Sequence, residues 1–168
     1  MRLSLEKILQ QKFAWTAVRI ALAWTFLWAF LDKTFGLGYA TESSKSWLNG
    51  GSPTEGYLKF ATSGPLTDFY QSLSGNAAVD VVFMIALLLL GVTLFLGIGL
   101  RLAAIGGSLL MLLMWSSGLP PANNPIIDDH IVYMFALIGL ALANAGQWYG
   151  LGKWWAKTPL VKRFPILG

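Results

Sequence analysis

Three adjacent ionisable residues, Asp128-Asp129-His130, stand at the start of the last long apolar run of the chain. An imidazole exchanges a proton near neutral pH and can hydrogen-bond a carbonyl oxygen, such as that of a quinone. An adjacent carboxylate could relay that proton to water, so we expect His130 and Asp129 to be catalytic. Carboxylates also stabilise the first turn of a helix by up to about 1 kcal/mol. Asp128 is therefore interpreted equally well as a helix-end residue or as part of the site.

Other polar residues could extend this candidate site. Tyr133 follows His130 by three residues and shares its face of a helix. Asp80 opens a second apolar run. We assign Tyr133, Asp80 and Asp128 to cofactor binding.

Arg19 lies inside the first apolar run, about two helical turns beyond Lys12. Ionisable residues within a membrane are functional candidates, so Arg19 joins the expected cofactor-binding residues. Two structural alternatives are favoured over catalysis. The side chain could reach back to the lipid headgroups, or it could form a hydrogen bond within the bundle, with Asn144 as a candidate neighbour.

The composition is that of an integral membrane protein. Of the 168 residues, 55% are hydrophobic and only 12% are charged, whereas a soluble domain carries about a quarter charged residues. Apolar runs of about 18 residues or more are long enough to cross the hydrocarbon core. We expect one all-α domain over residues 1–168, an integral membrane four-helix bundle. The expected spans are about 13–31, 79–98, 101–117 and 125–145, the last with Asn124 as N-cap and Pro125 as its first residue.

The distribution of charge predicts the orientation. Three of the twelve basic residues, Lys33, Lys45 and Lys59, fall in the connection 32–78 between the first two spans. The rest fall at the opposite side, near the N-terminus, at Arg101 and in the tail 146–168. Basic residues concentrate on the cytoplasmic side, so both termini are expected to be cytoplasmic in the cell membrane. The net charge of +4 then reflects topology and attraction to the lipid bilayer, not nucleic-acid binding.

The outer connection 32–78 carries two helix signals. Ser52-Pro53-Thr54-Glu55 has the spacing of a capping box. A second start follows Ser63-Gly64-Pro65, with apolar residues recurring at helical spacing through Leu66, Phe69, Tyr70 and Leu73. We expect two short amphipathic helices over the outer mouth of the bundle. They could simply cover the ends of the spans, which is the favoured interpretation, or form a lid over a lipophilic ligand.

The absence of cysteine limits the cofactors. The chain holds no Cys and one His, which excludes thiolate-bound clusters and two histidine ligands to a haem. We expect no metal, and no haem, iron–sulfur cluster or flavin bound by this chain alone. A diffusible quinone remains the expected cofactor for a redox role.

Four segments resemble DoxX-like and DoxD-like membrane proteins in their order and spacing. They are Arg19 with Trp24–Lys33, Trp47–Thr54, Asn124–Tyr133 and Gly146–Trp155. The resemblance covers about residues 14–156 and implies a four-helix membrane bundle. It further implies a subunit of thiosulfate:quinone oxidoreductase for the DoxD-like branch, and a link to membrane oxidoreductase complexes for the DoxX branch.

Two functions follow as expectations. The chain is a quinone-binding subunit of a membrane oxidoreductase, or it is a non-catalytic anchor or assembly subunit of a larger redox complex. The expected partners are the other subunits of such a complex or further copies of this chain. A transporter is less favoured, because the sequence has no inverted repeat and no broken helix at mid-membrane.

Overall fold

The computed structural model describes the backbone of residues 2–168 and the side chains from Glu6 onward, and this part of the chain is helical without a named strand. The four long helices are α1 (Arg2–Phe35), α4 (Ala77–Leu96), α5 (Leu100–Ser117) and α6 (Asp129–Leu142). The short helices are η1 (Ser43–Lys45), η2 (Trp47–Asn49), α2 (Glu55–Phe60), α3 (Thr67–Ser72), η3 (Ala145–Gln147), α7 (Gly152–Trp155), α8 (Pro159–Arg163) and η4 (Pro165–Leu167). The predicted all-α class is confirmed.

Three of the long helices, α1, α4 and α5, are long and apolar enough to cross a membrane. The expected spans 79–98 and 101–117 agree with α4 and α5 to within two residues. The expected span 13–31 lies inside a much longer helix. At 1.5 Å per residue, the 34 residues of α1 extend about 51 Å, so α1 exceeds the hydrocarbon thickness of about 30 Å.

The fourth expected span, 125–145, is corrected by the structure. Helix α6 has 14 residues and extends only about 21 Å, so a four-span bundle is not established by its length. Asn124 is not the N-cap. Its side-chain oxygen instead accepts the N–H groups of Ile126 and Ile127, both at 3.0 Å, which stabilises a local turn in place of a helix. The N-cap is Asp128.

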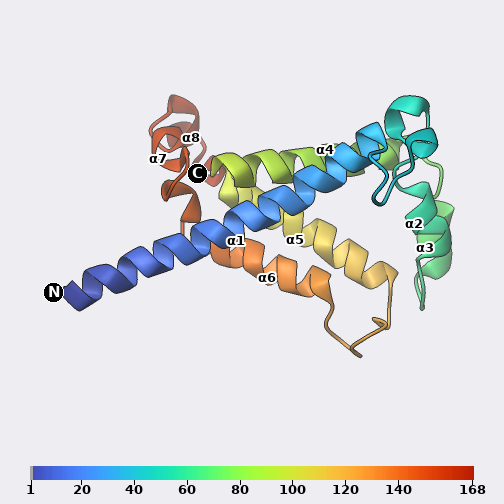
Figure 1. Cartoon of the computed structure of the whole chain (residues 1–168), viewed down its shortest axis with the longest axis horizontal. Coiled ribbons are helices and arrows are strands. Elements are labelled where there is room, and N and C mark those ends of the chain that lie inside the picture. The colour runs from blue at the N-terminus through green and yellow to red at the C-terminus, as the bar shows by residue number, and fades with distance from the viewer. Residues whose placement is uncertain (1) are drawn as a thin grey trace.

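The long helices pack in two closely contacting pairs, α1 with α4 and α5 with α6, and α4 also contacts α5. Figure 1 shows both chain termini at one end of the bundle and the helices α2 and α3 at the other. We call these the terminal end and the loop end. The fully buried core between the helices includes Ala23, Met84, Leu94, Leu137 and Leu140.

Small residues bring the helices close together. A Cβ atom at Gly107 would lie 2.6 Å from Leu137, and one at Gly139 would lie 2.8 Å from the ring of Trp15. Apolar side chains gain little by leaving lipid for a bundle interior, so close packing of this kind contributes much of the attraction between helices in a membrane. Large apolar side chains cover the outside of the bundle, among them Phe13, Val82, Leu89, Ile105 and Phe135. This surface matches a hydrocarbon environment.

Arg19 connects three segments at the terminal end. Its guanidinium is fully buried and donates to four backbone carbonyl oxygens: Leu94 at 2.6 Å, Phe95 at 2.9 Å, Trp148 at 3.3 Å and Tyr149 at 2.9 Å. The first two belong to the last turn of α4, where helical carbonyls have no partner within the helix and the helix dipole favours a cation. The other two follow η3. We refer to these four bonds as the Arg19 clamp.

Two glycines make the clamp possible. A Cβ at Gly146 would lie 2.2 Å from the carbonyl oxygen of Gly97, so the end of α4 and the turn after α6 are in backbone contact. Gly97 has a positive φ of 71° and ends α4 in the left-handed conformation. A Cβ at Gly97 would also lie 2.9 Å from Nη1 of Arg19. Larger residues would push apart the two backbone segments that Arg19 joins.

The C-terminal segment folds over the terminal end. The Leu151 N–H donates to the carbonyl of Leu96 at 2.8 Å, and Trp155 donates its indole N–H to the carbonyl of Leu167. Arg101, at the start of α5, donates to the carbonyl of Pro165 at 3.0 Å. The expected tail 146–168 is therefore a compact cap of short helices.

The Arg19 clamp predicts a large effect of Arg19→Lys. A lysine has three donors on one atom and cannot reach both pairs of carbonyls, so at least two buried acceptors lose a charged donor. We expect the free energy of unfolding to fall by about 2–4 kcal/mol. The measurement is the unfolding curve in mild detergent, monitored by circular dichroism at a wavelength that reports helix content.

Arg163→Lys provides the control, because Arg163 is exposed and a surface change of this kind alters stability by at most about 0.5 kcal/mol. Equal stabilities of the Arg19→Lys and Arg163→Lys proteins would contradict the clamp.

Candidate functional site

The first turn of α6 holds His130 against Asp128. Nδ1 of His130 lies 2.7 Å from Oδ2 of Asp128, while Oδ1 of the same carboxylate accepts the N–H groups of His130 at 3.0 Å and Ile131 at 3.3 Å. One carboxylate thus caps the helix with one oxygen and holds the imidazole with the other. The helix-end role considered for Asp128 is confirmed, and its part in a binding site stays a prediction.

The electrostatics of the pair keep Asp128 ionised. Its partial burial opposes ionisation, but the hydrogen bond and positive charge of His130, with the backbone bonds from Ile131 and His130, lower the pKa of Asp128 below its usual value. An ionised carboxylate only accepts hydrogen bonds, so Nδ1 of His130 carries the proton it shares with Asp128. The other ring nitrogen, Nε2, forms no hydrogen bond to the described residues. The side chain of His130 is 26% exposed, which gives an outside molecule access.

The residues next to the Asp128–His130 pair differ in their exposure. Asp129 is exposed, and among the described side chains no hydrogen bond connects it to His130. Tyr133 is partly buried and packs against the core. Helical spacing places it on the face of His130. Asp128, His130 and Tyr133 therefore lie together at the start of α6, and Asp129 is exposed beside them.

Asp80 lies at the loop end, and its side chain binds the connection between α1 and α4. Its side chain is buried, and Oδ1 accepts hydrogen bonds from Ser52 Oγ at 2.9 Å, Thr54 N at 3.1 Å and Thr54 Oγ1 at 2.6 Å. Ser52 Oγ in turn accepts the N–H of Glu55 at 3.1 Å, as the capping-box spacing predicts, but α2 begins at Glu55 with Thr54 as its N-cap, so Ser52 is not the N-cap. Asp80 anchors this capped turn to the first turn of α4.

Arg19 does not approach His130. The clamp holds its guanidinium at the terminal end, whereas α6 begins toward the loop end (Figure 1). Asn144, the neighbour considered from the sequence, is exposed, and the clamp uses backbone carbonyls. The structural alternative for Arg19, a hydrogen bond within the bundle, is the one that the structure contains.

Sequence reasoning missed the role of Asp32. This residue ends the predicted first span, is 2% exposed, and accepts the N–H groups of Tyr39 at 3.3 Å and Ala40 at 3.0 Å. The chain after α1 turns back onto its own last turn through Gly36 and Gly38, which both have positive φ. Two glycines that closely follow an acid at a helix end are the sequence signal that could have predicted this turn.

The helices α2 and α3 are fixed to the end of α5 by two tyrosines. The hydroxyl of Tyr57 lies 2.7 Å from Ser117 Oγ, and that of Tyr70 lies 2.6 Å from Ser116 Oγ. The predicted short helices of the outer connection are thus confirmed, and their tyrosine contacts favour the covering role over a mobile lid.

The pair Asp128–His130 predicts an acid-sensitive stability. Because the pKa of Asp128 is lower in the folded state, its ionisation stabilises the fold above the ordinary pKa of about 3.9, and this contribution is lost as the pH falls below that value. Lowering the pH from about 5 to about 3 therefore removes part of the contribution of the Asp128 carboxylate. We expect Asp128→Asn to reduce the fall in unfolding temperature between these two pH values, measured in mild detergent.

The exposed Asp68 provides the control, since Asp68→Asn should leave the fall unchanged. A fall of equal size in the wild type and in Asp128→Asn would contradict the role of this carboxylate.

No protein family, curated protein or solved structure matches the chain. The functional conclusion therefore rests on the chemistry of the residues described above and on the resemblance of the four sequence segments.

Proposed function

We propose that the chain is a membrane subunit of a quinone-linked oxidoreductase, in which His130 binds and protonates the quinone headgroup. The observation that carries the proposal is the hydrogen bond of 2.7 Å between His130 and the ionised Asp128 at the start of an apolar helix. The resemblance to DoxX-like and DoxD-like proteins supports the same class, with thiosulfate as the electron donor of the DoxD-like branch.

The chemistry assigns separate tasks to the residues of this site. Reduction of a quinone to a quinol takes two electrons and two protons. Nε2 of His130 hydrogen-bonds one quinone carbonyl and transfers a proton to it as the oxygen becomes negative. Asp128 stabilises the imidazolium before this transfer, and the exposed Asp129 passes protons from water. Tyr133, on the same face, contacts the quinone ring. The electrons come from a partner subunit.

The same proposal includes an orientation. With both termini in the cytoplasm, the loop end and His130 face the other side of the cell membrane, in agreement with the basic terminal end. Helix α6 then makes a short fourth crossing, with its first turn at the outer interface.

A second candidate, a non-catalytic anchor subunit, is favoured by a different observation. The buried charges Arg19, Asp32 and Asp80 all form hydrogen bonds that hold the fold together. The ring of His130 takes part in none of these bonds. The two candidates therefore differ in what happens when this histidine alone is replaced.

Replacement of His130 by Gln in the intact complex tests the proposal. Glutamine can hydrogen-bond a carbonyl but cannot transfer a proton, so we expect quinone reduction to fall about a hundredfold. The complex should still copurify in normal amounts, since the substituted side chain is partly exposed. The measurement is the rate of quinone reduction per purified complex.

Asn123→Ala, an exposed change close to the same helix start, is the matched control and should retain the full rate. An unchanged rate in His130→Gln, with normal assembly, would contradict the quinone proposal and support the anchor.

A further inference from the structure

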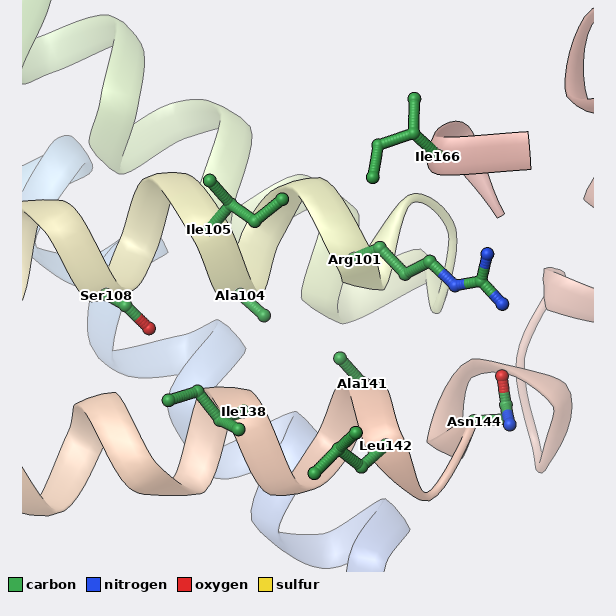
Figure 2. Close-up of a pocket in the computed structure, with 9 residues that line it drawn as sticks. All are labelled: Arg101, Ala104, Ile105, Ser108, Ile138, Ala141, Leu142, Asn144 and Ile166. Carbon is green, nitrogen blue, oxygen red and sulfur yellow. The ribbon is translucent and has the colours of Figure 1, made fainter. Parts of the chain in front are cut away.

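A groove between α5 and α6 opens at the terminal end, far along α6 from His130. It has a volume of about 600 Å³, within the range of ligand sites. Figure 2 shows Arg101 and Asn144 at one end of it, with Ile138 and Ser108 toward the other. The remaining lining residues are Ala104, Ile105, Ala141, Leu142 and Ile166. The groove thus has one polar end and an apolar length.

The groove lies on the outside of the bundle. Ile105 and Leu142, on its two flanking helices, are 60% and 78% exposed. Its residues on α5 recur at 101, 104, 105 and 108, and those on α6 at 138, 141 and 142, so one face of each helix forms each wall. Alanines and a serine at the facing positions leave the space between the helices open. A membrane-spanning α5 would present this space to lipid.

The polar end of the groove is basic. Arg101 is exposed and uses Nη1 to donate to Pro165, and its other guanidinium nitrogens form no hydrogen bond to described residues. Asn144 is exposed beside it. The sequence holds no acid after Asp129, the first residue of α6, so no side-chain carboxylate of the rest of α6 or of the C-terminal segment opposes the charge of Arg101. The net positive charge here complements a phosphate group.

We propose that this groove binds one anionic glycerophospholipid. Its phosphate accepts hydrogen bonds from Arg101 and Asn144, because a guanidinium group can donate two parallel hydrogen bonds to phosphate oxygens. One of its acyl chains lies along the apolar walls formed by Ala104, Ile105, Ile138 and Ala141. Basic pockets between membrane helices bind anionic headgroups by this combination of charge and burial. A neutral quinone would leave the arginine without a charged partner.

The test compares two lipids with identical chains. The purified protein, stripped of lipid in detergent, is titrated with dioleoylphosphatidylglycerol or dioleoylphosphatidylcholine, and bound lipid is counted by native mass spectrometry. We expect phosphatidylglycerol to bind about fivefold more tightly than phosphatidylcholine. Arg101→Gln, which removes the charge and keeps a polar side chain, should remove most of this preference. Arg163→Gln removes the same charge outside the groove and should retain it.

A second pair of variants tests the acyl-chain wall. Ala141→Leu fills the groove and should weaken binding of both lipids, whereas Ala21→Leu makes the same change on an exposed face of α1 and should not. Circular dichroism confirms that each variant is folded. Equal binding of the two lipids to the wild type, or equal losses in Arg101→Gln and Arg163→Gln, would overturn the proposal. Displacement of bound phosphatidylglycerol by decylubiquinone would overturn it too, because the groove would then be a quinone site.

Discussion

The fold depends on a positive charge that has no acidic partner. Arg19 lies within an apolar helix, where an isolated cation is costly, and four backbone carbonyls satisfy its terminal nitrogens in place of a carboxylate. Two of these carbonyls are the unpaired groups at the end of α4, so one side chain meets two requirements at once. Because the other two follow α6, the clamp joins the first, second and last long helices at the terminal end.

At the loop end, carboxylates accept hydrogen bonds from free donors, whereas at the terminal end Arg19 donates to free carbonyls. Asp32 and Asp80 accept N–H and hydroxyl groups of the connection between α1 and α4, and Asp128 accepts those at the start of α6. Each of these three acids thus satisfies backbone donors where a helix begins or ends. Asp128 differs from the others in that it also binds a titratable ring. This is why the proposed chemistry is confined to one turn of α6, while Arg19, Asp32 and Asp80 are explained by the fold.

The sequence predicted the elements that depend on local patterns and missed those that depend on distant contacts. Apolar length placed α4 and α5, and the Ser52–Glu55 spacing located α2. The start of α6 was wrong by four residues, because Asn124 and Asp128 are both good caps and only their actual hydrogen bonds distinguish them. The partners of Arg19 are backbone carbonyls, which any residue supplies, so no residue pattern could have identified them. Asp80 binds Ser52 and Thr54 of the connection between α1 and α4. A shared site of Asp80 with His130 therefore stays a prediction.

The most direct test of this account is on which side of the membrane each end lies. The chain has no native cysteine, so a maleimide labels only a cysteine that is introduced. Single cysteines at Lys45 and at Lys162, both exposed, can be labelled in intact cells with a maleimide that does not cross membranes. We expect labelling at 45 from outside and at 162 only after the cells are opened. Labelling of both positions from the same side would contradict a bundle whose loop end and terminal end lie across a bilayer.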